Sequence, residues 1–374
     1  MSGARLRVAV LGAGTVGREV VRALTERADE LHPADGAALE LRAVAVRDVA
    51  RAVASGIPAS LVSDAPAHLV AEDDIDVIVE LMGGDEPAHT LIAAALSMGK
   101  GVVTANKHVI AHHGAELEAI ARRTGATLRF EAAVGGGIPV LGPLAADLAG
   151  NRITRVRGIV NGTTNFILSS MTDEASPLDY AAALAEAQRL GYAEVDPAGD
   201  VEGLDAANKL VILARLAFDR WLDPETIRTR PDGVDGPAGP GITTVSLADQ
   251  RDAREAGRII RLVATASIDA DGEVWASVLP SALDRESPLG RTAGVRNRIE
   301  IDAAPLGRVG FDGPGAGGAA TSSAVLGDLI AVAREAGSTW GPRRPAAPDP
   351  GGAPIHSTGG VLQAASGIRY PIDD

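Results

Sequence analysis

Short, almost wholly apolar runs alternate with helical stretches over about the first 150 residues. The runs do not switch between apolar and polar residues, which is typical of strands buried on both faces of a parallel sheet. Regular strand–helix alternation predicts an α/β domain with a doubly wound sheet. The predicted strands are Leu6–Gly12, Leu39–Val46, Val77–Glu80, Gly101–Thr104 and Thr127–Glu131, and the predicted helices are Val16–Glu30, Ala88–Met98 and Gly114–Thr124.

A different pattern begins at about Asn151, where helices and strands no longer alternate regularly. Such a mixture predicts a second domain of the α+β class. Its predicted strands are Ile153–Val160, Ile259–Ile268, Glu273–Leu279 and Arg296–Asp302, and its predicted helices are Asp179–Leu190, Gly203–Phe218 and Leu247–Ala256. We further expect a Pro- and Gly-rich loop at Pro231–Gly241, a last helix at Ala320–Ala336, and a poorly ordered or surface-lying tail from Ser338 that contains Pro345–Pro354.

The composition excludes several classes of protein. A length of 374 residues with 46% apolar content is that of a globular protein with two or three domains. A net charge of −14 without a basic block argues against nucleic acid and anionic membranes as partners. No apolar run is long enough for a signal peptide or a membrane span, and cysteine is absent. We expect a cytoplasmic protein that acts on a small molecule.

A glycine-rich segment follows the first predicted strand and opens the first predicted helix. It reads Gly12-Ala13-Gly14-Thr15-Val16-Gly17, which fits G-x-G-x-x-G in the context that dinucleotide binding requires. Gly12 permits the tight turn, Gly14 lets a pyrophosphate approach the backbone, and Gly17 allows close helix packing. The N–H groups of the helix start attract phosphates. The segment predicts a Rossmann-type cofactor site, and the alternative is a glycine-rich turn without a ligand.

The end of the second predicted strand is expected to set the choice of cofactor. An acidic residue here binds the ribose 2′-OH of NAD, whereas arginine accommodates the 2′-phosphate of NADP. The sequence reads Val46-Arg47-Asp48. Arg47 favours NADP and Asp48 leaves NAD open, while two ordinary loop charges are the alternative.

Two polar segments follow the next two predicted strands, Met82-Gly83-Gly84 and Thr104-Ala105-Asn106-Lys107. Ligands of open α/β sheets bind at these carboxyl ends. Lys107 can bind a substrate carboxylate or polarise a carbonyl there, or it is a surface lysine in front of a helix.

A charged pair lies on the otherwise apolar predicted helix Gly203–Phe218. Asp205 and Lys209 are four residues apart and therefore share one face of the helix. Charges on a buried helix must be paired or must face a polar cavity. A lysine held by a carboxylate in a cleft can donate a proton to a carbonyl. A structural ion pair is the alternative.

Three other segments are weaker candidates. Glu131 precedes the turn Gly135-Gly136-Gly137, which can present carbonyl oxygens to a hard cation or merely open a helix at Pro139. Asn161–Asn165 suits a polar, amino-acid-like ligand or is a turn capped by Asn165. Gly313–Gly318 brings a second helix N-terminus to the cofactor or simply links two domains.

Three histidines lie close together in the sequence, His108, His112 and His113. No carboxylate spacing beside them makes a metal signature, so we interpret them as exposed histidines of a loop or a helix surface.

Seven motifs in one order along the chain resemble homoserine dehydrogenases. The resemblance covers about Arg5 to Ala336. The motifs are GAGTVG at Gly12–Gly17, ELMGG at Glu80–Gly84, TANK at Thr104–Lys107, FEAAVGGGIP at Phe130–Pro139, GIVNGTTNFIL at Gly158–Leu168, LGYAEVDPAGDVEGLDAANKL at Leu190–Leu210, and GPGAGGAATSSAVLGDL at Gly313–Leu329.

The resemblance implies an NAD(P)-dependent oxidoreductase that interconverts L-aspartate 4-semialdehyde and L-homoserine in threonine and methionine biosynthesis. It implies that Lys209 protonates the oxygen as hydride reaches the aldehyde carbon, and that Glu194 holds the substrate amino group. Asp205 is implied to orient Lys209, or else a water or the substrate amino group. A monovalent cation, with sodium as the expected ion, is also implied. The implied cofactor site consists of Gly12, Gly14, Thr15, Val16, Gly17, Arg47, Met82, Gly83, Lys107 and Gly315. The implied substrate site consists of Glu194, Lys107, Asn161, Gly162 and Thr163. The implied cation site consists of Glu131, Val134, Gly136 and Ile138.

The resemblance also implies a domain plan. Residues 1–150 would form the NAD(P)-binding Rossmann domain, 151–312 the substrate-binding and dimerisation domain, 313–337 a helix that returns to the nucleotide domain, and 338–374 the tail. A homodimer or homotetramer is implied. Only about 38 residues follow Ala336, so we expect neither a regulatory ACT domain nor an aspartate kinase domain.

Two rival functions are considered. One is another two-domain NAD(P)-dependent dehydrogenase, against which Glu194, Asp205 and Lys209 argue together. The other is a nucleotide sensor without catalysis, which would have no need of a desolvated lysine such as Lys209.

Overall fold

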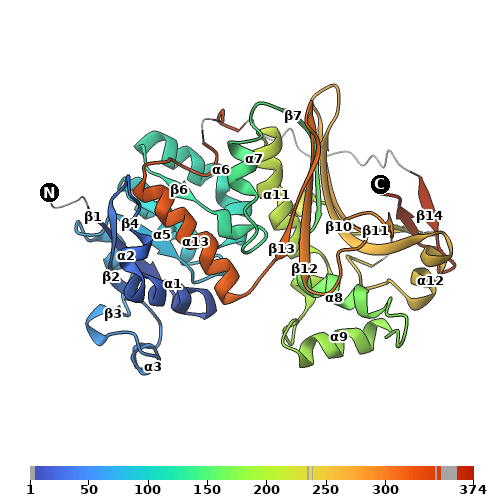
Figure 1. Cartoon of the computed structure of the whole chain (residues 1–374), viewed down its shortest axis with the longest axis horizontal. Coiled ribbons are helices and arrows are strands. Elements are labelled where there is room, and N and C mark those ends of the chain that lie inside the picture. Colours follow the sequence, from blue (N-terminus) through green and yellow to red (C-terminus); the bar gives the residue numbers. More distant parts are fainter. Residues whose placement is uncertain (1–4, 234–235, 238, 342, 347–359) are drawn as a thin grey trace. The chain divides into compact units, whose positions relative to one another are not determined.

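The computed structural model describes residues 5–233, 236–237, 239–341, 343–346 and 360–374. The chain divides into two compact units, which are Met1–Asp147 with Ala316–Ala347 and Leu148–Gly315 with Pro348–Asp374. Parts of the predicted loop Pro231–Gly241 and most of the stretch Pro345–Pro354 lie outside the described residues. Figure 1 labels the elements of both units.

The first unit contains a six-stranded parallel sheet in the order β3-β2-β1-β4-β5-β6. This is the strand order of a doubly wound dinucleotide-binding domain, so the predicted fold class is confirmed. Because the central strands are buried on both faces, their apolar runs mark their ends well. The strands are β1 (Arg5–Leu11), β2 (Ala38–Ala45), β3 (Val62–Ser63), β4 (Val77–Glu80), β5 (Gly101–Thr104) and β6 (Leu128–Arg129).

The helices of this unit differ from the predicted ones mainly at their starts. Asn106 caps α6 by accepting a hydrogen bond from the Val109 N–H at 3.2 Å, so α6 begins at Lys107 and not at Gly114. The predicted helix Val16–Glu30 is two helices that meet at Arg27. The helices are α1 (Thr15–Glu26), α2 (Ala28–Leu31), α3 (Val49–Ala54), α4 (Pro66–Ala71), α5 (Ala88–Ser97), α6 (Lys107–Thr124), α7 (Leu141–Ala145) and α13 (Gly318–Ala333), with 3-10 turns η1 (Ala59–Leu61) and η2 (Glu131–Ala133).

The core of the first unit joins segments from both ends of the chain. Val8 and Val10 of β1 pack with Val20 of α1 and with Val325 and Leu329 of α13. Figure 1 shows α13 lying beside α1. The C-terminal helix is therefore part of the nucleotide-binding unit.

The second unit contains a five-stranded antiparallel sheet in the order β11-β10-β7-β12-β13. Strand β13 was not predicted from the sequence, because it is glycine-rich and largely exposed. Helix α8 was not predicted either. The strands are β7 (Arg152–Ile159), β10 (Arg258–Ile268), β11 (Val274–Asp284), β12 (Arg296–Ala304) and β13 (Gly307–Pro314), and the helices are α8 (Gly162–Ser170), α9 (Tyr180–Arg189), α10 (Ala198–Val201), α11 (Leu204–Phe218) and α12 (Leu247–Glu255), with the 3-10 turn η3 (Pro224–Thr226).

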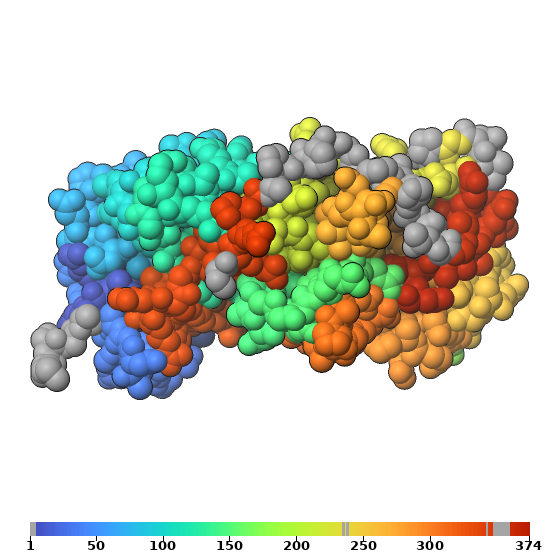
Figure 2. All heavy atoms as spheres, turned by 90° about the horizontal axis from the view of Figure 1, so that it is seen from above, coloured from blue at the N-terminus to red at the C-terminus, as the bar shows by residue number. Residues whose placement is uncertain are grey.

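Of the two alternatives predicted for the tail, poor order is wrong for its last residues, which form strands, although most of them are exposed or half-buried. Strands β14 (Val361–Gln363) and β15 (Arg369–Pro371) pair with each other, and β15 pairs with β8 (Asp232–Gly233), which pairs in turn with β9 (Gly236–Pro237). The buried Tyr370 hydroxyl donates to Asp249 at 3.0 Å. In Figure 2 these residues (red) lie against the orange residues of the second unit.

Among the described residues, no helix is long and apolar enough to cross a membrane.

Candidate functional site

Two of the three glycines in the turn between β1 and α1 cannot be replaced by a larger residue. Gly12 has φ of +102°, and a Cβ placed on Gly17 would lie 2.0 Å from the Gly12 carbonyl oxygen. By contrast, a Cβ on Gly14 would meet nothing within 4 Å. Gly12 and Gly17 are thus required by packing, whereas Gly14 leaves open space at the start of α1, where a phosphate can approach the backbone N–H groups.

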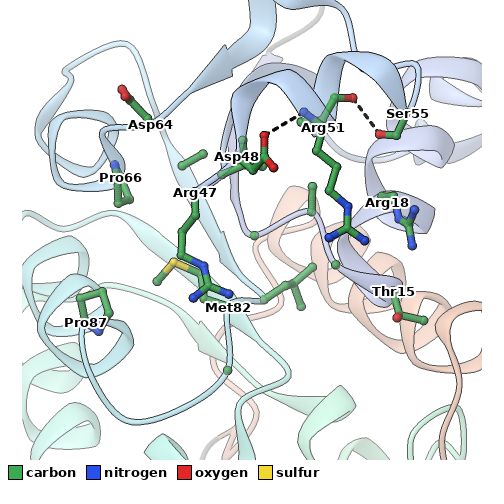
Figure 3. Close-up of a pocket in the computed structure, with 18 of the residues that line it drawn as sticks. Thr15, Arg18, Arg47, Asp48, Arg51, Ser55, Asp64, Pro66, Met82 and Pro87 are labelled. Atoms are coloured by element: carbon green, nitrogen blue, oxygen red, sulfur yellow. Dashed lines mark hydrogen bonds between the residues drawn. The ribbon is translucent and has the colours of Figure 1, made fainter. Parts of the chain in front are cut away.

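A cavity of about 600 Å³ lies over this turn, and three arginines line it. Figure 3 shows Arg47 and Arg51 with their guanidinium groups turned toward the cavity, and Arg18 beside them. None of the three forms an ion pair with another described residue. Asp48 instead accepts a hydrogen bond from the Arg51 N–H at 2.9 Å and so caps α3. The part of the cavity wall that these three arginines form is therefore cationic.

Glu80 holds Met82 and Gly83, two residues that line the cavity, and the sequence alone did not single it out. This fully buried carboxylate accepts hydrogen bonds from the N–H groups of Met82 at 2.7 Å and Gly83 at 3.2 Å. It also accepts one from the Thr104 hydroxyl at 2.6 Å. Its position at the end of a buried strand, just before two glycines, is a signal that could have identified it.

The same loop is tied to the start of α6. Asn106 donates from its side-chain amide to the Gly84 carbonyl at 2.8 Å, in addition to capping the helix. Lys107, the first residue of α6, is half-buried at this edge of the sheet. The loop and helix start therefore lie together at the carboxyl ends of β4 and β5, as predicted for a ligand site.

The carboxylate of Glu131 is surrounded by backbone donors. It accepts hydrogen bonds from the N–H groups of Val140 and Leu141, both at 2.8 Å, and Gly142 at 2.7 Å. Burial, followed by the nearby Asp328 carboxylate, raises the pKa of Glu131 above its usual value. Asp328 in turn accepts a hydrogen bond from the Glu131 N–H at 2.8 Å.

The glycine turn after Glu131 carries the other predicted cation ligands. Gly135 and Gly136 both have positive φ, +72° and +59°. Within the described chain, the carbonyls of Val134, Gly136 and Ile138 accept no backbone hydrogen bond in this turn.

In the second unit, Lys209 lies at the centre of a buried polar cluster. Its side chain on α11 donates to the Val160 carbonyl at 2.7 Å and to the Asp205 carboxylate at 2.8 Å. Lys209 is only 8% exposed, and its neighbours Leu210 and Leu213 are fully buried. The predicted pair on an apolar helix thus forms, and its charges are desolvated and hydrogen-bonded.

Asn161 extends this cluster to a carboxylate that the sequence analysis did not name. Its side-chain amide donates to Asp205 at 2.8 Å and to Asp200 at 2.7 Å. Its carbonyl oxygen accepts from the Thr164 N–H at 2.8 Å and so caps α8. The cap of this segment is therefore Asn161 and not Asn165, whose amide instead donates to the Arg296 carbonyl.

Glu194 is not part of the Lys209 cluster. Its side chain is exposed, on a segment where Val195 is 97% exposed. Two hydrogen bonds fix the backbone of this segment, from Thr163 to the Tyr192 carbonyl at 2.7 Å and from Gln188 to the Glu194 carbonyl at 3.0 Å. Gly162 is required by packing, because a Cβ there would lie 2.9 Å from the Val295 carbonyl.

The glycine cluster before α13 serves two purposes. A Cβ on Gly315 would lie 2.0 Å from the buried Asn297 amide, so the second unit requires glycine there. A Cβ on Gly318 would lie 2.9 Å from the Thr15 carbonyl oxygen, which places the start of α13 against the start of α1. The expected second helix N-terminus beside the nucleotide turn is therefore present in the first unit.

The chain contains three lysines, and two of them are candidate site residues. Lys107 is half-buried, while Lys100 and Lys209 are each 8% exposed. Lys100 donates to the Glu72 carbonyl, away from the cavity lining.

Comparison with known proteins gives a consistent result. The family model for homoserine dehydrogenase matches residues 139–330, and the model for the homoserine dehydrogenase NAD-binding domain matches residues 12–131. The chain is 45% identical over 336 residues to a homoserine dehydrogenase of Corynebacterium glutamicum, covering 89% of this chain and 73% of that protein. It is 44% identical over 331 residues to one of Mycobacterium tuberculosis, covering 87% and 72% of the two chains.

Solved structures agree. The crystal structure of a homoserine dehydrogenase from Thiobacillus denitrificans matches with a TM-score of 0.82 and 37% identity, covering 89% of this chain and 74% of that one. A hyperthermophilic archaeal homoserine dehydrogenase in complex with NADPH matches with a TM-score of 0.69 and 29% identity, covering 87% and 97%.

Proposed function

Because the chain belongs to the homoserine dehydrogenase family, it is an NAD(P)-dependent oxidoreductase, and we propose that Lys209 moves the proton in its reaction. The enzyme interconverts L-homoserine and L-aspartate 4-semialdehyde in aspartate-family amino-acid biosynthesis. NAD(P), when bound, supplies the hydride transfer. The residues of this chain bind and orient the reactants and handle the proton.

The buried contact between Lys209 and Asp205 is the observation that carries this proposal. A desolvated ammonium is a good donor to an alkoxide forming from an aldehyde, because little water competes for the proton. The 2.8 Å bond to Asp205 and the 2.7 Å bond to the Val160 carbonyl fix the direction of the Lys209 side chain. In the oxidation direction the same amine accepts the proton of the homoserine hydroxyl.

Asn161 acts as a positioning residue for this group. Both N–H bonds of its amide are used, one on Asp205 and one on Asp200, so it holds the carboxylates and leaves substrate contact to others. We assign the substrate amino group to Glu194, supported by its exposed carboxylate on a segment anchored by Thr163. Substrate contacts are also proposed for the backbone of Gly162 and, in the first unit, for Lys107.

NADP is the proposed cofactor in preference to NAD. The cationic wall formed by Arg47, Arg51 and Arg18 suits a 2′-phosphate. Asp48, which could favour NAD, uses its carboxylate to cap α3. Gly14, Thr15, Val16 and Gly83 provide the backbone that faces the phosphates and the rest of the cofactor.

A monovalent cation is proposed at the glycine turn after Glu131. The donor set is the Glu131 carboxylate with the carbonyls of Val134, Gly136 and Ile138, all hard oxygens of the kind that sodium prefers. The positive φ of Gly135 and Gly136 and the absence of backbone hydrogen bonds to the three carbonyls within the described chain support this assignment. The role proposed for the cation is to stabilise the turn, because its ligands would be backbone carbonyls and the Glu131 side chain.

The assembly is proposed to be a homodimer or homotetramer. Size-exclusion chromatography with light scattering on the full chain decides this, and a monomer at all concentrations would contradict it.

The test of Lys209 uses absorbance at the nicotinamide band with L-homoserine, once with NADP and once with NAD. Replacing Lys209 with Met removes the ammonium at nearly constant volume, and we expect kcat to fall by about 10²- to 10⁴-fold with NADPH affinity unchanged. Lys209→Arg keeps the charge but not the proton transfer and should lose turnover equally. Lys100→Met is the matched control among the three lysines. Turnover within a few-fold of wild type in a folded Lys209→Met would contradict the role.

A further inference from the structure

The first unit gathers four of the chain's seven histidines at the facing starts of α5 and α6. His89 and His113 stack with ring centroids 3.9 Å apart and an angle of 12° between planes. The His89 Nε2 lies 3.1 Å from a Glu116 carboxylate oxygen, and the His113 Nε2 lies 2.8 Å from Asp85. The earlier interpretation of surface histidines without a carboxylate partner is therefore wrong for His113.

This group has the composition and spacing of a metal site. One ligand atom each from His89, His113 and Glu116 lies within 4.8 Å of the other two. Two atoms bound to one zinc-class ion at about 2.1 Å are at most about 4.2 Å apart, so modest rotations of the side chains bring all three into range. His113 and Glu116 are three residues apart on one face of α6, a spacing that lets both side chains reach one ion.

We propose that His89, His113 and Glu116 bind a divalent transition-metal ion of the zinc class, with Asp85 holding the His113 ring through its hydrogen bond. Two imidazole nitrogens with carboxylate oxygens favour zinc-class ions over magnesium or calcium. The site shares no residue with the Glu131 turn or with the Lys209 cluster, and it goes beyond the proposed function.

The cluster combines fixed side chains with access for an ion. The hydrogen bond between Asp85 and the His113 Nε2 holds the His113 ring, and Glu116 lies against the His89 Nε2. The two histidine side chains are half-buried, 19% and 27% exposed, so an ion can reach them from solvent.

An ion held here acts on the cofactor cavity through one loop. Asp85 lies between residues that line that cavity, namely Met82 and Gly83 before it and Glu86 and Pro87 after it. Glu86 also contacts His89, at 3.3 Å. Coordination of His113 and His89 would fix the side chains to which Asp85 and Glu86 are hydrogen-bonded, and with them this loop. The affinity for NADPH should therefore depend on the metal.

The test titrates chelator-treated full-length protein with Zn²⁺ by calorimetry. We expect one ion per chain, with affinity at least about tenfold weaker in His89→Ala and in Glu116→Gln. Glu116→Gln keeps the volume of an exposed side chain, which guards against misfolding. His68→Ala is the matched control, because His68 forms a comparable exposed pair with Glu72 at 2.8 Å on α4. Binding that is absent in wild type, or unchanged in both cluster variants, would overturn the site.

Two further readouts sharpen the result. Co²⁺ should give the visible absorption of a low-coordinate site in wild type and not in His89→Ala. Zn²⁺ should change the NADPH dissociation constant in wild type and leave it unchanged in His89→Ala. Equal NADPH affinity with and without Zn²⁺ would overturn the coupling through the loop.

Discussion

The nucleotide turn is built from backbone, whereas the Lys209 cluster is built from side chains. At the turn, Gly12 and Gly17 are fixed by contacts of 2.0 to 2.8 Å that a Cβ would make with backbone atoms. In the cluster, Lys209, Asp205, Asn161 and Asp200 are joined by side-chain hydrogen bonds of 2.7 to 2.8 Å. The turn requires positions without a side chain, whereas the cluster requires particular side chains. Substitutions should therefore damage folding at the turn and turnover in the cluster.

Gly17→Ala should have the largest effect. The new Cβ would lie 2.0 Å from the Gly12 carbonyl oxygen, which cannot yield without moving β1 or α1. We expect a loss of about 3 kcal/mol of stability and of NADPH binding, measured by urea unfolding and fluorescence titration. Gly14→Ala is the contrast, because it meets no atom within 4 Å. It should unfold like wild type and still bind NADPH at least about tenfold more weakly. If Gly17→Ala and Gly14→Ala were equally stable, the distinction between a glycine required by packing and one required by the ligand would be wrong.

Asn161→Leu should have the next largest effect. It removes both donors to Asp205 and Asp200 and leaves two carboxylates facing an apolar side chain. We expect kcat to fall by about 10²-fold, with a shifted pH profile and unchanged NADPH affinity. Asn151→Leu, which removes only a 3.4 Å bond to Leu148, is the control in the same unit. A purely structural role for Asn161 would lower stability without shifting the pH profile.

Arg47→Ala should have a moderate and selective effect. Losing one charge-assisted contact to a 2′-phosphate should raise the KM for NADP by about tenfold and leave that for NAD unchanged. Arg42→Ala is the control, because Arg42 is already paired with Glu40 and Asp74. Equal changes for the two cofactors would show that Arg47 does not read the phosphate.

The smallest effect is expected from sodium at the Glu131 turn. The raised pKa means that the folded state binds the Glu131 proton more tightly than the unfolded state. This contribution to stability is present below the unfolded pKa and is lost as pH rises through the folded pKa. Sodium should therefore raise Tm relative to choline at about pH 8 and less at about pH 4. The difference should vanish in Glu131→Gln, and its persistence there would argue against a cation at this turn.

Sequence patterns predicted the parallel sheet well and the antiparallel sheet less well. Strands β4 and β5 have the predicted bounds because both faces of each are buried. Strand β13 has only one buried residue, Gly313, so no apolar pattern marked it. Strand β15 could not be foreseen, since the burial of Tyr370 depends on Asp249 and on pairing with β8, both distant in sequence.

In the candidate site, too, contacts between residues close in sequence were predicted, and contacts between distant segments were not. The spacing of Asp205 and Lys209 within one helix predicted their contact, because helical geometry is local. The contact of Asn161 with Asp205 joins segments 44 residues apart and needed the fold. The pairing of His89 with Glu116 was missed for the same reason, since it joins two helices.

Because the chain contains so few lysines, amine-reactive reagents can modify it selectively. Of the three lysines, Lys100 and Lys209 are buried, which leaves Lys107 as the most accessible. An amine-acylating reagent applied to the intact fold should therefore modify Lys107 before the other two. The extent of that labelling, read by mass spectrometry, becomes a footprint of ligands at the carboxyl ends of β4 and β5. For the same reason, immobilising the protein through its lysine amines would couple it by this edge of the sheet and obstruct it.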